Sequence, residues 1–102
     1  MTRTARLTTV SWGTKPPAEG ADPVDSNVSQ AIETIDMAAQ DGGDLVCLSE
    51  AFAHRNMDMP QALERSETVP GPITERIGEA AKRHDCYVVA GMYERRGEDV
   101  HN

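Results

Sequence analysis

The spacing of apolar positions changes several times along the chain, and each change predicts a new element of secondary structure. Residues 5–12 alternate loosely and include β-branched side chains, which is typical of a strand. A loop rich in Gly, Pro and Asp follows over residues 13–25. From Ser26 or Asn27, both good N-caps, the pattern predicts a helix that ends at Gly42 and Gly43. Its apolar positions are Val28, Ile32, Ile35 and Ala39.

The second half of the chain repeats this change of period. Residues 45–49 are a short, continuously apolar run that predicts a buried strand, and the polar residues 51–69 predict a long loop with a helical turn near Gln61 to Arg65. Pro72 can open a helix, and residues 86–92 predict a third strand. The apolar face of that helix comprises Ile73, Ile77, Ala80 and Ala81. Gly97 then predicts a hairpin turn, with a return strand starting at Val100.

The predicted order is strand, helix, strand, helix, strand, turn, which indicates the α/β class. Such alternation favours a mostly parallel sheet with right-handed crossovers and helices packed on it. A length of 102 residues allows one domain, so residues 1–102 are expected to form a single unit.

Composition narrows the possible partners and the compartment. The net charge is −7 with acids spread along the chain, so no nucleic acid is expected as a partner. Apolar residues make up 38% of the chain, but no run is long enough to span a membrane, and residues 1–10 do not form a secretory signal. Cys47 and Cys86 lie in apolar runs and are predicted to be small buried thiols in a reducing compartment, the cytoplasm. No cysteine and histidine spacing suggests a metal site.

Glu50 is the main candidate for chemistry because it ends the apolar run 45–49. Functional residues of parallel sheets gather at the carboxyl ends of the strands, although a surface carboxylate at a strand end is also common. Phe52, an apolar residue two positions later, is expected to be buried and is a candidate for the substrate pocket. His54 is a second pocket candidate, together with Arg55 and Asn56, but a solvated loop is the better explanation of these polar residues.

Three segments in the same order give the chain a family resemblance. They are residues 44–50 (DLVCLSE), 69–76 (VPGPITER) and 87–95 (YVVAGMYER). With these segments the chain resembles the N-terminal part of the nitrilase superfamily, the carbon-nitrogen hydrolases. The resemblance implies an α-β-β-α sandwich and a catalytic triad of Glu, Lys and Cys that needs no metal and no cofactor. Glu50 matches the glutamate of that triad, the general base.

The other two triad residues have no counterpart in this chain, because the family places both beyond the third strand. Cys86 is followed by Tyr87 and Val88, whereas the family's cysteine box continues with aspartate, and Cys86 opens a strand while Glu50 closes one. Strand alternation places Cys47 on the face opposite that of Val46, Leu48 and Glu50. Lys15 in the first loop and Lys82 late in the second helix do not match the catalytic lysine either.

Two functional hypotheses follow from these patterns. The first is the N-terminal portion of a carbon-nitrogen hydrolase, inactive alone, whose complete form cleaves a small amide, nitrile or carbamoyl substrate and, as is common in the family, pairs sandwiches into homo-oligomers. The second is a non-catalytic α/β module for binding or assembly, since a short sheet leaves an edge open to another chain. A flavodoxin-like nucleotide binder is a weaker alternative, because Gly13-Thr14-Lys15-Pro16 lacks the spacing of a phosphate loop.

Overall fold

The computed structural model describes residues 3–11, 13 and 15–102. Its elements are β1 (Leu7–Thr9), α1 (Pro23–Gln40), β2 (Leu45–Cys47), the 3-10 turn η1 (Phe52–His54), α2 (Met59–Glu64), α3 (Pro72–His84), β3 (Tyr87–Val89), β4 (Glu94–Arg96) and β5 (Asp99–His101). The predicted alternation of strands and helices is confirmed. Each strand is three residues long, shorter than predicted. Trp12, at the end of the predicted first strand, lies outside the described residues.

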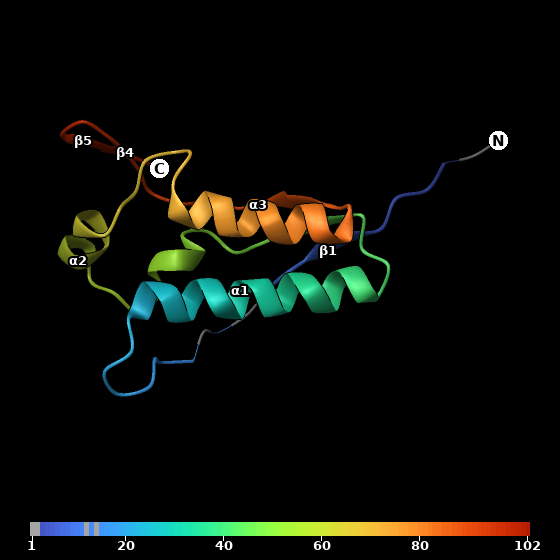
Figure 1. The fold of residues 1–102 in the computed structure, drawn as a ribbon, viewed down its shortest axis with the longest axis horizontal. Helices are drawn as coiled ribbons and strands as arrows, with labels where there is room; N and C mark the ends of the chain where they lie inside the picture. Colours follow the sequence, from blue (N-terminus) through green and yellow to red (C-terminus); the bar gives the residue numbers. More distant parts are fainter. Residues whose placement is uncertain (1–2, 12, 14) are drawn as a thin grey trace.

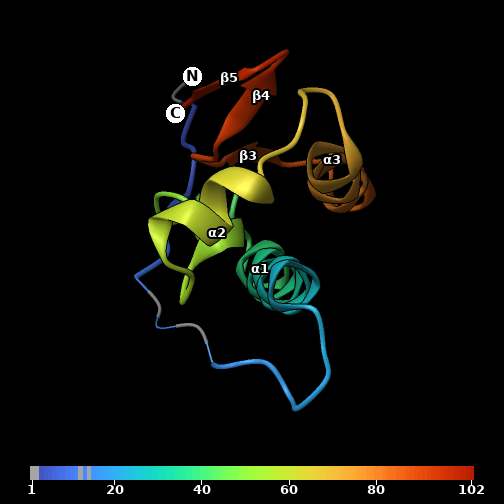
Figure 2. The ribbon, with the colours of Figure 1, turned by 90° about the vertical axis from the view of Figure 1, so that its left-hand side faces the viewer.

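The first three strands form a parallel sheet in the order β1-β2-β3. Leu45 lies opposite Leu7 on one side and opposite Tyr87 on the other. Helices α1 and α3 run side by side in Figure 1 and appear end-on in Figure 2, where both cover one face of the sheet. The expected α/β class is confirmed, and one sheet with one helical layer matches half of the sandwich that the resemblance implies.

The opposite face of this sheet is open. Leu7, Tyr87 and Val89 point to that side, because they alternate with the buried positions, and they are 68%, 77% and 52% exposed. Large apolar side chains on one contiguous surface are typical of a surface that another element or chain covers.

Helix α1 begins earlier than the sequence predicted. Asp22 is the N-cap, its side chain accepts a hydrogen bond from Asp25 N, and Pro23 occupies the first helical position. The prediction that Ser26 or Asn27 caps the helix is therefore wrong. The reason is local, because proline has no N–H to lose and its fixed φ suits a first turn.

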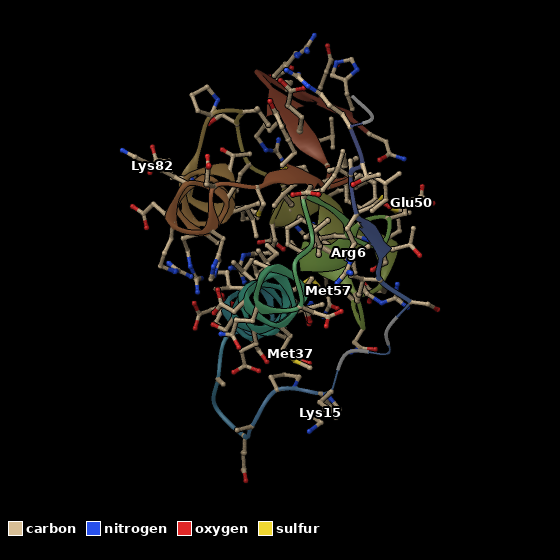
Figure 3. All side chains as sticks on the ribbon, turned by 90° about the vertical axis from the view of Figure 1, so that its right-hand side faces the viewer. Arg6, Lys15, Met37, Glu50, Met57 and Lys82 are labelled. Carbon is tan, nitrogen blue, oxygen red and sulfur yellow. The ribbon has the colours of Figure 1, made fainter. Side chains whose placement is uncertain are left out.

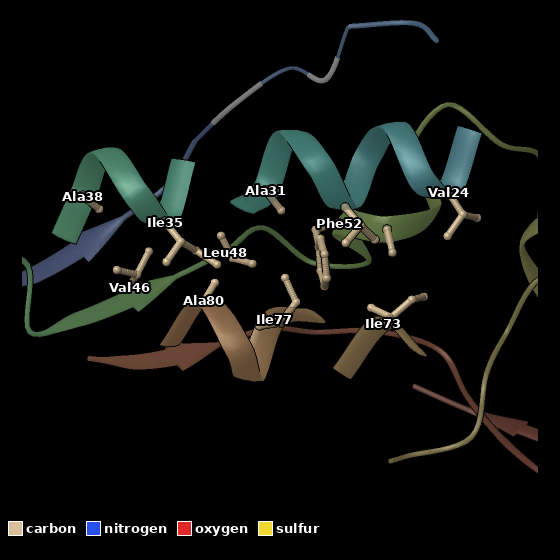
Figure 4. Close-up of a cluster of buried hydrophobic side chains, with 12 residues drawn as sticks. Val24, Ala31, Ile35, Ala38, Val46, Leu48, Phe52, Ile73, Ile77 and Ala80 are labelled. Carbon is tan, nitrogen blue, oxygen red and sulfur yellow. The ribbon is translucent and has the colours of Figure 1, made fainter. Parts of the chain in front are cut away.

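The core lies between the two helices and the sheet (Figure 4). Val28, Ile35, Val46 and Phe52 are fully buried, and burial of each such side chain stabilises the fold by about 1.5–3 kcal/mol. From α3 the core receives Ile73, Ile77 and Ala80, as predicted, whereas the predicted Ala81 is only half-buried. The inward face of α1 uses Ala31 and Ala38, whereas the predicted Ile32 and Ala39 are only half-buried.

Two sets of ion pairs join α1 to α3 outside the core. Near the helix starts, Arg76 Nη1 lies 2.7 Å from Asp25 Oδ1. Near the helix ends, Asp36 Oδ1 accepts from His84 Nε2 at 2.5 Å and from Arg83 Nη2 at 2.9 Å. The hydrogen bonds from His84 and then Arg83 lower the pKa of the Asp36 carboxyl.

The connection from β2 to α3 is more ordered than the long loop that was predicted. Asp58 caps α2 in a reciprocal pair with Gln61, in which each side chain bonds the other's backbone N–H. At the start of α3, Glu67 Oε1 accepts from Ile73 N at 2.8 Å. The predicted hairpin is confirmed: β4 and β5 pair antiparallel around Gly97, whose φ is 61°.

Candidate active site

Glu50 lies just beyond β2, at the carboxyl edge of the parallel sheet. The ladder continues past the strand as far as Leu48, whose N–H donates to Val89 O at 2.8 Å, and the chain then turns at Ala51, which has a φ of 49°. The predicted alternation holds for the buried Val46 and Leu48. It ends before Glu50, which is exposed, because the strand no longer dictates the direction of its side chain. The carboxylate is thus reachable from solvent at the sheet edge.

Two distant segments meet Glu50. Asn102 Nδ2, just after β5, donates to Glu50 Oε1 at 3.2 Å. Gly91, just after β3, packs so closely that a Cβ added to it would lie 3.5 Å from Glu50 Cα and 3.9 Å from Glu50 Cγ. The ends of three strands therefore converge on this carboxylate. Gly91 belongs to the segment 87–95 that carries the family resemblance, whereas nothing local in the sequence signals the contact with Asn102.

Phe52 is fully buried, as expected, and belongs to the core. Its ring also lines a mainly apolar cavity of about 260 Å³ between α3 and β3. The other lining residues are Ile73, Thr74, Ile77, Gly78, Ala81, Val88, Ala90 and Met92. Glu50 does not line this cavity. In the described chain, Phe52 borders the apolar cavity, whereas the Glu50 carboxylate faces solvent.

His54 is 4% exposed, so the solvated loop that explains polar residues at this position is wrong for His54. Its Nε2 lies 3.1 Å from Arg65 O, and a carbonyl only accepts, so Nε2 carries the proton in that bond. The ring also packs against Tyr93, with centroids 5.6 Å apart. Nδ1 is buried without a hydrogen-bond partner among the described residues. His54 thus connects η1 to Arg65, the residue just after α2.

Asn27 is a polar residue of α1 that lies inside the protein, only 1% exposed. Its Nδ2 donates to Ala53 O at 3.0 Å and to Arg55 O at 2.9 Å. Both carbonyls belong to the loop that follows Glu50. The sequence pattern predicts Asn27 only as a helix cap, although its place on the apolar stripe beside Val28 is a signal of burial.

An ion pair ties the same loop region to the start of α1. Both terminal nitrogens of the Arg65 guanidinium bond the Asp22 carboxylate, with Nη2 to Oδ2 at 2.9 Å. This hydrogen bond is the main cause that lowers the pKa of Asp22 from 3.8 to about 2. The side chains are 41% and 42% exposed, so solvent screens much of the attraction.

Comparison with known proteins assigns the family. A model of the carbon-nitrogen hydrolase family matches residues 18–102. The chain belongs to the carbon-nitrogen hydrolase family. Nitrilase homolog 2 from Dictyostelium discoideum is 37% identical over 71 residues, which cover 69% of this chain and 21% of that protein. The chain therefore spans about a fifth of the length of the curated relative it matches.

The lysines and cysteines of this carbon-nitrogen hydrolase chain lie where the sequence placed them. Lys15 precedes α1 and Lys82 is in the last turn of α3, and Figure 3 shows both on sides of the molecule away from Glu50. Cys86 comes just before β3 and Cys47 ends β2, and both are half-buried rather than fully buried. Burial raises the pKa of the Cys86 thiol, which disfavours the nucleophilic thiolate.

Across residues 3–11, 13 and 15–102, no group of three or more His, Cys, Asp or Glu side chains is arranged to hold a metal ion. In the same part of the chain, no helix has the length and apolar character that crossing a bilayer requires.

Proposed function

We propose that this chain supplies the general base, Glu50, of a carbon-nitrogen hydrolase that acts on a small non-peptide amide, nitrile or carbamoyl substrate. Family membership over residues 18–102 supports the reaction class. The observation that carries the proposal is the setting of Glu50: an exposed carboxylate at the carboxyl edge of the sheet, flanked by the buried Leu48 and Phe52. A rigid flank with a reachable carboxylate suits a group that must exchange protons with a substrate.

The mechanism that the resemblance implies gives Glu50 two proton transfers. With an amide or carbamoyl substrate it first accepts the proton of a cysteine thiol, whose sulfur attacks the substrate carbon to form a thioester, and the same proton leaves with the amine or ammonia. With a nitrile the same attack gives a thioimidate, which one water molecule converts to the thioester and ammonia. Glu50 then takes a proton from water, which attacks the thioester and releases the acid, and that proton returns to the departing cysteine sulfur. A lysine stabilises the oxyanion in each step. We propose that this lysine and cysteine come from sequence outside these 102 residues, so that residues 1–102 are the N-terminal portion of the catalytic domain.

The proposed enzyme acts on a small molecule, assembles into a homo-oligomer and works in the cytoplasm. A net charge of −7 disfavours nucleic acid as a partner, and the family's pairing of sandwiches makes a homo-oligomer the expected assembly. The two cysteines are unpaired, which agrees with a reducing compartment such as the cytoplasm.

The first test is turnover by the purified chain alone. We expect no measurable amidase, nitrilase or carbamoylase activity, because one triad residue of three cannot form the thioester. Turnover that disappears in Glu50→Gln would show instead that the 102 residues are sufficient.

The second test gives Glu50 its missing partners. In a chimera, residues 18–102 replace the matching N-terminal part of Dictyostelium nitrilase homolog 2, and turnover is compared with that of the same chimera carrying Glu50→Gln. We expect a loss of at least about 10²-fold in kcat, in the range of general acid–base catalysis. Equal thermal unfolding of the two proteins is the control for folding. Unchanged kcat in a folded Glu50→Gln chimera would exclude Glu50 as the base.

A second candidate function is an assembly module, which the open sheet face favours. If it is correct, the chain alone is monodisperse, unfolds cooperatively and binds a partner through Leu7, Tyr87 and Val89. Self-association of the folded chain through this face, with no other partner bound, would favour the hydrolase portion instead.

A further inference from the structure

We infer that Asn27 is a positioning residue for the candidate base: it holds the loop after Glu50 in the shape that presents the carboxylate. The inference rests on the proposed function, since it takes Glu50 to be the group that needs placing. Asn27 does not touch Glu50. It acts through the turn that begins at Ala51, the next residue in the chain.

The hydrogen bonds of Asn27 are directed at that turn. Both bonds start from Nδ2, at 3.0 Å to Ala53 O and 2.9 Å to Arg55 O, so the two protons of the amide are both used. The turn itself is closed by His54 N, which donates to Ala51 O at 3.0 Å. A residue of α1 thus fixes two carbonyls, two and four positions beyond Ala51.

The turn needs this support because it starts from an unusual backbone conformation. Ala51 has a φ of 49°, in the left-handed region. Residues other than glycine adopt this conformation at a cost in free energy and keep it only when surrounding contacts impose it. Gly91 lies beside Glu50, at a distance at which an added Cβ would make an ordinary van der Waals contact with Glu50 Cα. We expect a relaxed turn to shift Glu50 relative to both Gly91 and Asn102.

The primary amide of Asn27 supplies two N–H donors, which side chains of the same size do not. A buried carbonyl that loses its donor must be left unpaired or turn toward water, and either change reshapes the loop. Aspartate has the same shape but offers only acceptors when ionised, and leucine offers no polar atom. Asparagine beyond the cap of a helix also weakens the helix slightly, so its place in the second turn of α1 is better explained by the loop than by α1.

The direct test is NMR spectroscopy of the whole 102-residue chain. In the native protein we expect scalar couplings across the hydrogen bonds from Asn27 Nδ2 to the carbonyl carbons of Ala53 and Arg55. We also expect slow solvent exchange of the Asn27 side-chain amide and nuclear Overhauser contacts between Gly91 and Glu50. Fast exchange of that amide without the couplings would overturn the inference, and this measurement needs no variant.

Variants then separate positioning from general stability. We expect Asn27→Asp and Asn27→Leu to weaken the Gly91–Glu50 contacts and to shift the resonances of residues 51–55. The matched control is Val28→Ala, at a fully buried neighbour in the same helix, which should lower the melting temperature but keep those contacts. Intact Gly91–Glu50 contacts in a folded Asn27→Leu protein would overturn the inference.

Activity in the chimera gives a readout that a purely structural role would not produce. We expect Asn27→Leu to lower kcat by about 10²-fold, the scale of a small misplacement of a catalytic group, with KM nearly unchanged. Val28→Ala should leave both close to those of the parent chimera. If Glu50→Gln is fully active while the NMR contacts depend on Asn27, the proposed function fails and the structural role of Asn27 remains. The positioning role fails if kcat is unaffected in a folded Asn27→Leu chimera.

Discussion

Gly71 and Gly78 show how differently single residues of the same helix region tolerate one added carbon. A Cβ on Gly71, the residue that caps α3, would lie 2.4 Å from Thr68 O, which is a backbone atom that cannot move aside cheaply. A Cβ on Gly78, inside α3, would have no heavy atom within 4 Å of it. Position 71 therefore has no room for a methyl group, whereas position 78 has.

We therefore expect opposite effects on stability from the same substitution. Gly71→Ala should lower the free energy of unfolding by about 1–3 kcal/mol, as overpacking does. Gly78→Ala should raise it by about 0.5–1 kcal/mol, because alanine loses less backbone entropy in a helix. Urea unfolding followed by circular dichroism measures both. A similar change in the two variants would contradict the packing at Gly71.

The polar residues near Glu50 mark how far sequence reasoning extends at this scale. The pattern predicted the strand that ends near Glu50 and the burial of Phe52, because apolar runs and strand ends are local signals. It did not predict the buried His54 or the bonds of Asn27, since both depend on carbonyls elsewhere in the fold. The contact between Asn102 and Glu50 spans 52 residues of sequence, and only the tertiary fold creates it.

Among the elements, α1 and α2 are joined by a charged contact whose strength depends on pH. Arg65 lowers the pKa of Asp22 in the folded state to about 2, whereas the ordinary pKa of aspartate is 3.8. The ion pair therefore stabilises the fold fully at pH values above 3.8. This stabilisation is lost as the pH falls from about 3.8 through about 2. Asparagine can still cap α1, so Asp22→Asn removes the charge while it keeps the cap.

We expect Asp22→Asn to lower the free energy of unfolding by about 0.5–1 kcal/mol near neutral pH, the range of a well-screened surface pair. The difference from the native protein should shrink toward about pH 2. Urea unfolding of both proteins over this pH range is the measurement. Asp41→Asn is the control, because the Asp41 side chain is 88% exposed and 3.9 Å from Arg6. A difference that is independent of pH would exclude the ion pair as its cause.

Element types were predictable from periodicity, whereas element limits were not. Gly42, with a φ of 87°, and Pro72 marked the end of α1 and the start of α3 because their backbone preferences are strong. The start of α1 was missed because Asp22 and Pro23 were assigned to a loop by composition. The strands are shorter than their apolar runs, since hydrogen bonding to a neighbour rather than side-chain character decides where a strand ends.

For the molecule as a whole, the main feature is a sheet with helices on one side only. Sequence alternation predicted the parallel sheet and its crossovers, but only the packing shows that one face is left open. Helices α1 and α3 lie on the same side, as two crossovers of the same hand along the order β1-β2-β3 require.

We expect the isolated chain to self-associate through this face as its concentration rises. Burial of the exposed side chains of Leu7, Tyr87 and Val89 in a contact between copies has a favourable free energy. Tyr87→Lys should raise the concentration needed for association by about tenfold or more, in line with the loss of one apolar side chain. Met37→Lys is the matched control, because Met37 is 71% exposed on α1 rather than on the sheet. Sedimentation equilibrium measures the association. An equal effect of both substitutions would place the contact elsewhere.

The hairpin of β4 and β5 also has a consequence for motion. It is held by a bridge between Glu67 and Glu94, by Arg95, which donates to Glu67 O and Leu63 O, and by Asn102. Segments with few buried apolar contacts open locally at a small fraction of the global unfolding free energy. We expect the hairpin to open while the parallel sheet stays folded, and each opening breaks the hydrogen bond from Asn102 Nδ2 to Glu50 Oε1. The exposed carboxylate of Glu50 thus loses its hydrogen bond to Asn102 through a movement of the last nine residues, whereas Leu48 and Phe52, which flank it in the chain, stay in the core.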